Sequence, residues 1–164
     1  KLAMGDSLTG LFTRRYFDMS LKKEITRSSR YGKDMRILMI DLDNFKNIND
    51  SKGHLFGDEV LRRVGTVLTT VSREEDVLCR YGGEEFVIIL PETNTSGAFI
   101  FAERLRLEMS GKEFFRENSI TFSGGISSYE QAGEDASELL NCADKALYKA
   151  KLSGKNCSAV YTQA

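Results

Sequence analysis

A glycine pair between two apolar runs constrains the fold of this chain more than any other feature. Gly82-Gly83 separates the apolar run 77–79 from the apolar run 86–90. A Gly-Gly pair between two β-type runs predicts a tight hairpin, because primed turns need positive φ angles that glycine adopts freely. Glu84-Glu85 follows at once, where the return strand would ordinarily be apolar. The hairpin therefore holds two carboxylates at a sheet end, an arrangement that suits a metal ion and a phosphate chain.

Length and charge limit the classes of protein that the chain can represent. With 164 residues and a net charge of −1, we expect a single domain over residues 1–164, with no nucleic acid and no membrane contact as partners. No apolar run approaches the roughly 18 residues of a membrane helix. Cys79, Cys142 and Cys157 lack metal-ligand spacing, so free thiols in a cytoplasmic domain are expected. The start at Lys1 suggests the C-terminal part of a longer regulatory protein, whose N-terminal region could include a membrane tether.

The order of the predicted elements specifies a fold class. Helices are predicted over 17–31, 44–49, 54–71, 94–110 and 135–152, and strands over 36–43, 77–79, 86–90, 119–126 and 157–161. Strand, helix, hairpin, helix and strand in this order predict an α+β sandwich with a ferredoxin-like βαββαβ core, an antiparallel central sheet and additional helices. The first and third strands are neighbours in that plan. Asp41 is therefore expected beside Glu84 and Glu85.

Acidic residues that converge from two strands indicate a cation site. Hard oxygen ligands favour Mg²⁺ or Mn²⁺, which accept substrate phosphates as further ligands. The alternative is that Asp41 and Glu84 only end their strands, and their convergence argues against it. Asn44, Phe45 and Lys46 follow at the start of a predicted helix, where free backbone N–H groups form an anion cradle.

Motifs spread along the chain resemble the GGDEF domains of bacterial diguanylate cyclases. They are DSLTGL at 6–11, DLDNFKNIND at 41–50, GH at 53–54, GD at 57–58, RYGGEEF at 80–86, ADKALY at 143–148 and AK at 150–151. The resemblance covers nearly the whole chain and implies a fold similar to nucleotide cyclase and polymerase palm domains. It also implies that two GTP give cyclic di-GMP and two pyrophosphates. One domain holds one GTP, so a homodimer of facing domains is implied.

The resemblance implies roles for residues at the hairpin and at the end of the first strand. Asp41, Glu84 and the backbone carbonyl of Leu42 match the metal ligands, with two Mg²⁺ or Mn²⁺ ions per active site. Glu84, Glu85 and Asp41 match the catalytic carboxylates. Gly82 and Gly83 leave room for a nucleotide across the backbone.

Other matched positions imply substrate contacts. Asn49 and Asp58 match the guanine-reading pair, which agrees with chemistry because a carboxylate accepts from guanine N1–H and N2–H₂ whereas adenine presents an acceptor at N1. The expected phosphate contacts are Asn44, Phe45, Lys46, Lys151 and Lys155. Lys155 replaces the usual arginine, which keeps the charge and loses the bidentate geometry.

A second site is implied upstream of the hairpin. Arg73 and Asp76 form an Arg-x-x-Asp pattern at the spacing from Gly82 that the family uses for product inhibition by cyclic di-GMP. Arg104 is the expected secondary contact there, with a surface ion pair as its alternative.

Two departures and two alternatives complete the interpretation. Thr13 replaces a usual asparagine, and Ser123-Gly124-Gly125 has an extra glycine where a β-former is common.

A non-catalytic sensor that binds GTP or cyclic di-GMP is the first alternative to an active cyclase, but such relatives generally lose signature acids that this chain keeps. A palm-type transferase acting on nucleic acid is the second, and the near-neutral charge and the lack of a basic stripe argue against it.

Overall fold

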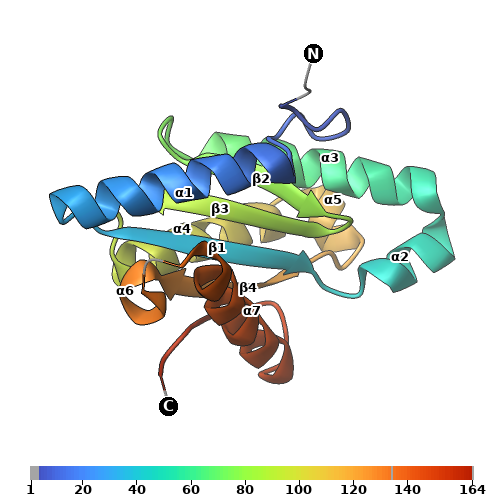
Figure 1. Cartoon of the computed structure of the whole chain (residues 1–164). Helices are drawn as coiled ribbons and strands as arrows, with labels where there is room; N and C mark the ends of the chain where they lie inside the picture. The colour runs from blue at the N-terminus through green and yellow to red at the C-terminus, as the bar shows by residue number, and fades with distance from the viewer. Residues whose placement is uncertain (1–3, 134, 164) are drawn as a thin grey trace.

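The computed structural model describes residues 4–133 and 135–163, which form a five-stranded sheet between two helical layers (Figure 1). The sheet order is β2-β3-β1-β4-β5. The strands are β1 (Met35–Leu42), β2 (Val77–Gly82), β3 (Glu85–Pro91), β4 (Phe122–Ser128) and β5 (Ser158–Val160). All neighbours pair antiparallel except β4 and β5, which are parallel. The first four strands have the predicted ferredoxin-like order.

The helices cover both faces of the sheet. They are α1 (Arg14–Tyr31), α2 (Phe45–Lys52), α3 (His54–Val71), α4 (Thr95–Ser110), α5 (Glu113–Glu117), α6 (Tyr129–Ala132) and α7 (Ala136–Leu152). In Figure 1, α1 and α7 lie in front of the sheet, and α3, α4 and α5 lie behind it. No helix of the described residues is both long enough and apolar enough to cross a membrane.

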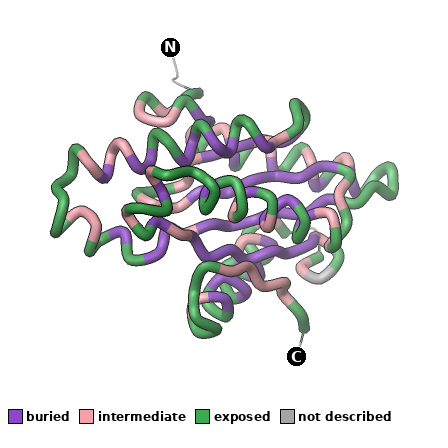
Figure 2. Tube along the Cα trace, turned by 180° about the vertical axis from the view of Figure 1, so that it is seen from behind, coloured by how far each residue is buried: buried purple, intermediate pink, exposed green. Residues whose placement is uncertain are grey.

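The central strand β1 is buried on both faces, as its continuous apolar run predicts. Ile37 and Met39 join the core beneath α1 and α7, whereas Leu38 and Ile40 join the core beneath α3 and α4. Figure 2 shows the resulting buried strands between exposed helical surfaces. Because side chains alternate along a strand, Asp41 continues the face that α1 and α7 cover.

Side-chain caps explain where several helices begin. The Thr13 hydroxyl accepts a hydrogen bond from Tyr16 N, so α1 begins three residues before the predicted start. Asn94 and Asp135 cap α4 and α7 at their predicted starts. The predicted strand 119–126 instead begins at Phe122, because Ser119 has φ 54° at the end of α5. The short helices α5 and α6 were not predicted.

The glycine hairpin is confirmed, but its predicted turn geometry is wrong. Residues 83 and 84 join β2 to β3, and neither glycine has a positive φ. The strand register shifts between Arg80 and Gly82. The Arg80 guanidinium donates two hydrogen bonds to the Gly83 carbonyl, of 3.1 and 3.0 Å. The Arg80 side chain and the shift in strand register therefore stabilise this turn, which does not have the backbone conformation of a primed turn.

Candidate active site at the end of strands β1 and β3

The predicted convergence of acidic residues is present in the backbone of the sheet. Asp41 lies opposite Glu85 in the antiparallel register of β1 and β3. One step further, Leu42 N donates a 3.2 Å hydrogen bond to the Glu84 carbonyl. Residues more than 40 positions apart in sequence thus meet at one end of the sheet, as the ferredoxin-like order requires.

Charges at this sheet end favour a cation. Burial is the largest influence that raises the pKa of Glu85, and the carboxylates of Asp41, Asp144 and Glu84 raise it further. Burial alone would lower the pKa of Lys151, but its hydrogen bond to Asp41 and the nearby acidic charges raise it overall. The crowding of acidic groups fits a metal site.

One oxygen of Asp41 is free to bind such a cation. Lys151 Nζ donates to Oδ2, while Oδ1 is buried without a hydrogen-bond partner among the described residues. No group of three or more acidic, histidine or cysteine side chains with metal-binding geometry occurs within residues 4–133 and 135–163. The expected ligands are the carboxylates of Asp41 and Glu84 and the carbonyl of Leu42. Because Mg²⁺ takes six ligands, these three would leave coordination positions for a substrate.

The loops beside Asp41 bring the predicted phosphate contacts together. Asn44 has a left-handed backbone (φ 56°) and begins α2 without capping it by its side chain. Its Oδ1 instead accepts a 2.9 Å hydrogen bond from Lys155 Nζ. Phe45 packs into the core, so only its backbone is available to a ligand, and Lys46 is exposed. Lys155 therefore lies at the same end of β1 as Lys151, next to the N-terminus of α2.

Asp43 has a structural role that the sequence did not reveal. It is 4% exposed, and its carboxylate accepts hydrogen bonds from Thr121 Oγ1 (2.7 Å), Ser123 Oγ (2.7 Å) and Asn156 N (3.0 Å). These donors come from the residue before β4, from β4 itself and from the loop after α7. Asp43 thus joins the end of β1 to the loop that carries Lys155.

Replacing Asp43 with asparagine is expected to lower the free energy of unfolding by about 1–3 kcal/mol, because three hydrogen bonds to a buried charge are weakened. Urea unfolding followed by circular dichroism measures the change. Asn156→Gly is the matched control, since it keeps the N–H donor and relieves a residue at φ 49°. Equal stability of Asp43→Asn and the unaltered protein would show that these three bonds contribute little.

Asp6 supports the hairpin from the N-terminal segment, which was also not predicted. Its carboxylate accepts from Thr9 N (2.8 Å), Thr9 Oγ1 (2.7 Å) and Arg80 Nη1 (3.3 Å). Burial opposes ionisation of Asp6, but these hydrogen bonds and the Arg80 charge lower its pKa overall. Because Arg80 also binds the Gly83 carbonyl, Asp6 fixes the turn next to Glu84.

The predicted guanine contacts lie on adjacent helices, α2 and α3. Asn49 Oδ1 is buried without a hydrogen-bond partner among the residues described. A Cβ at Gly57 would lie 1.9 Å from that oxygen, so only glycine leaves Asn49 its position. Asp58 follows in the second turn of α3 and is partly exposed.

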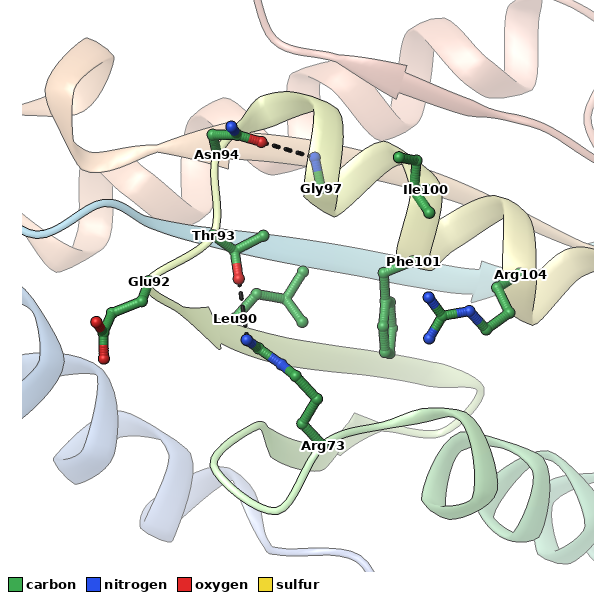
Figure 3. A pocket seen from close by; sticks show the side chains of 9 residues that line it. All are labelled: Arg73, Leu90, Glu92, Thr93, Asn94, Gly97, Ile100, Phe101 and Arg104. Atoms are coloured by element: carbon green, nitrogen blue, oxygen red, sulfur yellow. Dashed lines mark hydrogen bonds between the residues drawn. The ribbon is translucent and has the colours of Figure 1, made fainter.

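The predicted inhibitory residues lie at the other end of β3. Arg73 and Arg104 line a cavity of 310 Å³ beside the start of α4 (Figure 3). Arg73 Nη2 donates to Asp76 Oδ1 (2.9 Å), to the Pro91 carbonyl (2.9 Å) and to Thr93 Oγ1 (3.0 Å). The Asp76 side chain is completely buried and does not line the cavity. Because β3 spans about 20 Å, this cavity is separate from Asp41 and Glu85.

Comparisons with known proteins find relatives over nearly the whole chain. The model of the family described as "Diguanylate cyclase, GGDEF domain" matches residues 3–157. The chain is 44% identical to the response regulator PleD of Caulobacter vibrioides over an alignment of 161 residues that covers 95% of this chain and 36% of PleD. It is 40% identical to diguanylate cyclase A of Treponema denticola over 157 residues, covering 92% of this chain and 42% of that protein. The chain thus spans about a third to two fifths of these relatives.

A solved structure shows the same fold. The GGDEF domain of DgcB from Caulobacter crescentus, in complex with c-di-GMP, superposes with a TM-score of 0.92 at 32% identity. The match covers 99% of this chain and 96% of that domain. By sequence match and by fold, this chain belongs to the GGDEF domain family of diguanylate cyclases.

Proposed function

We propose that this domain condenses two GTP molecules into cyclic di-GMP and releases two pyrophosphates. The observation that carries the proposal is the pairing of Asp41 with Glu85 across β1 and β3, with Glu84 bonded to Leu42 one step further. It gathers carboxylates from two strands beside Lys151, as metal-assisted phosphoryl transfer requires.

We expect two Mg²⁺ or Mn²⁺ ions at this sheet end. We expect Asp41, Glu84 and the carbonyl of Leu42 to hold them, and the unpartnered Oδ1 of Asp41 supports a ligand at that position. When bound, the ions supply neutralisation of phosphate charge and a lowered pKa of the attacking hydroxyl. We expect Glu84 or Glu85 to accept the proton of the attacking 3′-hydroxyl.

Backbone and lysine groups would hold the triphosphate. The first N–H groups of α2 are not capped by Asn44, so they can donate to phosphate oxygens. Lys151 and Lys155 lie at the same end of β1 and supply positive charge. Gly83 adds no obstruction, because a Cβ there would meet nothing within 4 Å.

Asn49 and Asp58 would select guanine. The carboxylate of Asp58 can accept from both N1–H and N2–H₂ of guanine, whereas N1 of adenine would face it as a second acceptor. The buried, unpartnered Oδ1 of Asn49 supports a donor from the ligand at that position. Discrimination against ATP follows from the unpaired acceptor that adenine would leave.

Ring closure needs two such domains. Each 3′-hydroxyl attacks the α-phosphorus of the other nucleotide, so two copies must face each other with one GTP each. We therefore expect a homodimer in catalysis, with a synthesis rate that rises faster than linearly with protein concentration.

Incubation with GTP and Mg²⁺, followed by chromatography of the products, tests the function. Cyclic di-GMP with two equivalents of pyrophosphate is the expected result. Unchanged GTP that nevertheless binds the protein would favour the non-catalytic sensor. Reaction only when a nucleic acid is added would favour a palm-type transferase.

We also propose that the cavity between Arg73 and Arg104 binds cyclic di-GMP and inhibits synthesis. Two guanidinium groups beside one cavity suit an anionic ligand with guanine O6 and N7 acceptors. Asp76 would act by holding Arg73, because both of its oxygens accept from that residue.

Replacing Arg73 with alanine is expected to raise the cyclic di-GMP concentration for half-inhibition by at least about tenfold, since a charged hydrogen bond is lost. Synthesis at low product concentration should persist. Initial rates at increasing cyclic di-GMP measure the effect, and Arg62→Ala, at an exposed arginine of α3, is the control. Unchanged inhibition in Arg73→Ala would eliminate this cavity as the inhibitory site.

A further inference from the structure

Positive charge is concentrated in α1 and the residue pair that follows it. Residues 14–33 contain seven lysines and arginines against two acidic residues, Asp18 and Glu24, although the whole chain carries −1. The expectation that the chain lacks a basic stripe is therefore wrong, because net charge conceals how the charges are distributed.

Four of these cations lie on one side of α1. By helical spacing, Arg15, Lys22, Lys23 and Arg30 share the side opposite the buried Phe17, Leu21 and Ile25. From Arg15 to Arg30 this basic stripe extends about 22 Å. Met19 and Thr26 lie within it, and the two acidic residues lie on its flanks.

The ion pairs of α1 lie on the flank of the basic stripe. Arg27, on the flank, pairs with Glu24 (3.1 Å) and Glu92 (3.0 Å). No ion pair within 4.0 Å reaches any cation of the stripe from the described part of the chain. Three of these cations, Lys22, Lys23 and Arg30, line a shallow hollow of 370 Å³ together with Thr26, Arg27 and Tyr31. Such a hollow is suited to phosphate groups.

We propose that the basic stripe of α1 docks on an anionic lipid surface and binds lipid phosphates. A straight helix presents its four cations to a plane at the same time, and clusters of this size on a helix recognise acidic lipids. Met19 is 50% exposed within the stripe, and Tyr31, which is 64% exposed, is an aromatic residue of the kind that enters the interfacial region of a bilayer. The charge and this exposed apolar surface together favour lipid over nucleic acid.

Most of the stripe lies apart from the candidate active site, although Lys22 also lines a cavity with Glu85 and Asp144. The stripe points away from the sheet, whereas Asp41 and Lys151 lie at the end of β1 between the sheet and α7. Net charge predicts no membrane contact, and the proposal replaces that prediction for α1.

Flotation with lipid vesicles tests the proposal without using enzymatic activity. The protein should float with phosphatidylglycerol–phosphatidylcholine vesicles and remain unbound with phosphatidylcholine alone, and added salt should weaken binding. Each cation near such a surface contributes about a fivefold factor to partitioning, so Lys22→Glu with Lys23→Glu should lower the partition coefficient at least about twentyfold.

The matched control is Lys112→Glu with Arg116→Glu, which makes the same charge change at α5 behind the sheet. Circular dichroism verifies that both variants fold. Retained vesicle binding by the control supports docking through α1. Three results would overturn the proposal. The unaltered protein could fail to float, both variants could lose vesicle binding equally, or the protein could bind a single-stranded oligonucleotide and no vesicles.

Discussion

Asp41→Asn is expected to abolish cyclic di-GMP formation while the domain remains folded. The substitution keeps the shape of the side chain and removes the charge that faces Glu85 across the sheet. Losing one metal-binding carboxylate should lower the synthesis rate by at least about a thousandfold, which corresponds to about 4 kcal/mol of transition-state stabilisation. Glu84→Gln should have a similar effect. Chromatography of products from GTP and Mg²⁺ measures both losses.

The stability of these variants separates lost chemistry from lost structure. The ion pair between Asp41 and Lys151 is partly exposed, so its removal should cost less than about 1 kcal/mol. Asp50→Asn changes an exposed aspartate of α2 in the same way and should leave synthesis unchanged. Near-normal turnover in either Asp41→Asn or Glu84→Gln would contradict the assignment of metal ligands.

Topology made the meeting of Asp41 with Glu84 and Glu85 predictable. The apolar run of β1, the glycine pair and the helix patterns indicated the order of elements, and the ferredoxin-like arrangement then made β1 and β3 neighbours. The observed register pairs Asp41 with Glu85 directly. This convergence needed only element types and their order, which local sequence encodes well.

Local sequence patterns could not predict the side-chain contacts that hold the site. Asp43 binds donors 78 to 113 residues away, and no local pattern distinguishes it from Asp41. The turn at Gly83 likewise depends on Arg80, and Arg80 depends on Asp6. The primed-turn prediction failed because the Arg80 side chain, which the distant Asp6 holds, supplied the stabilisation that backbone conformation was expected to provide.

The extra glycine of β4, Gly125, is required by close packing, and its replacement is expected to cause the largest loss of stability. At Gly125 the strand lies directly against α7. A Cβ there would be 2.2 Å from the Ala143 carbonyl oxygen and 2.4 Å from Leu147 N. Both atoms belong to helix backbone, so no rotation of a side chain can relieve the contact. A β-former at this position is excluded by the close packing of α7 on the sheet.

Gly125→Ala is therefore expected to lower the free energy of unfolding by about 3 kcal/mol or more, since α7 must move off β4 as a unit. Urea unfolding followed by circular dichroism measures the loss. Gly83→Ala is the matched control, because a Cβ there meets nothing within 4 Å and the backbone has no positive φ. A change below about 0.5 kcal/mol in Gly125→Ala would contradict the close approach of α7 to β4. Because α7 carries Lys151, a shift of this helix would also withdraw the lysine from Asp41, so the same glycine sets both the stability of the fold and the spacing of the site.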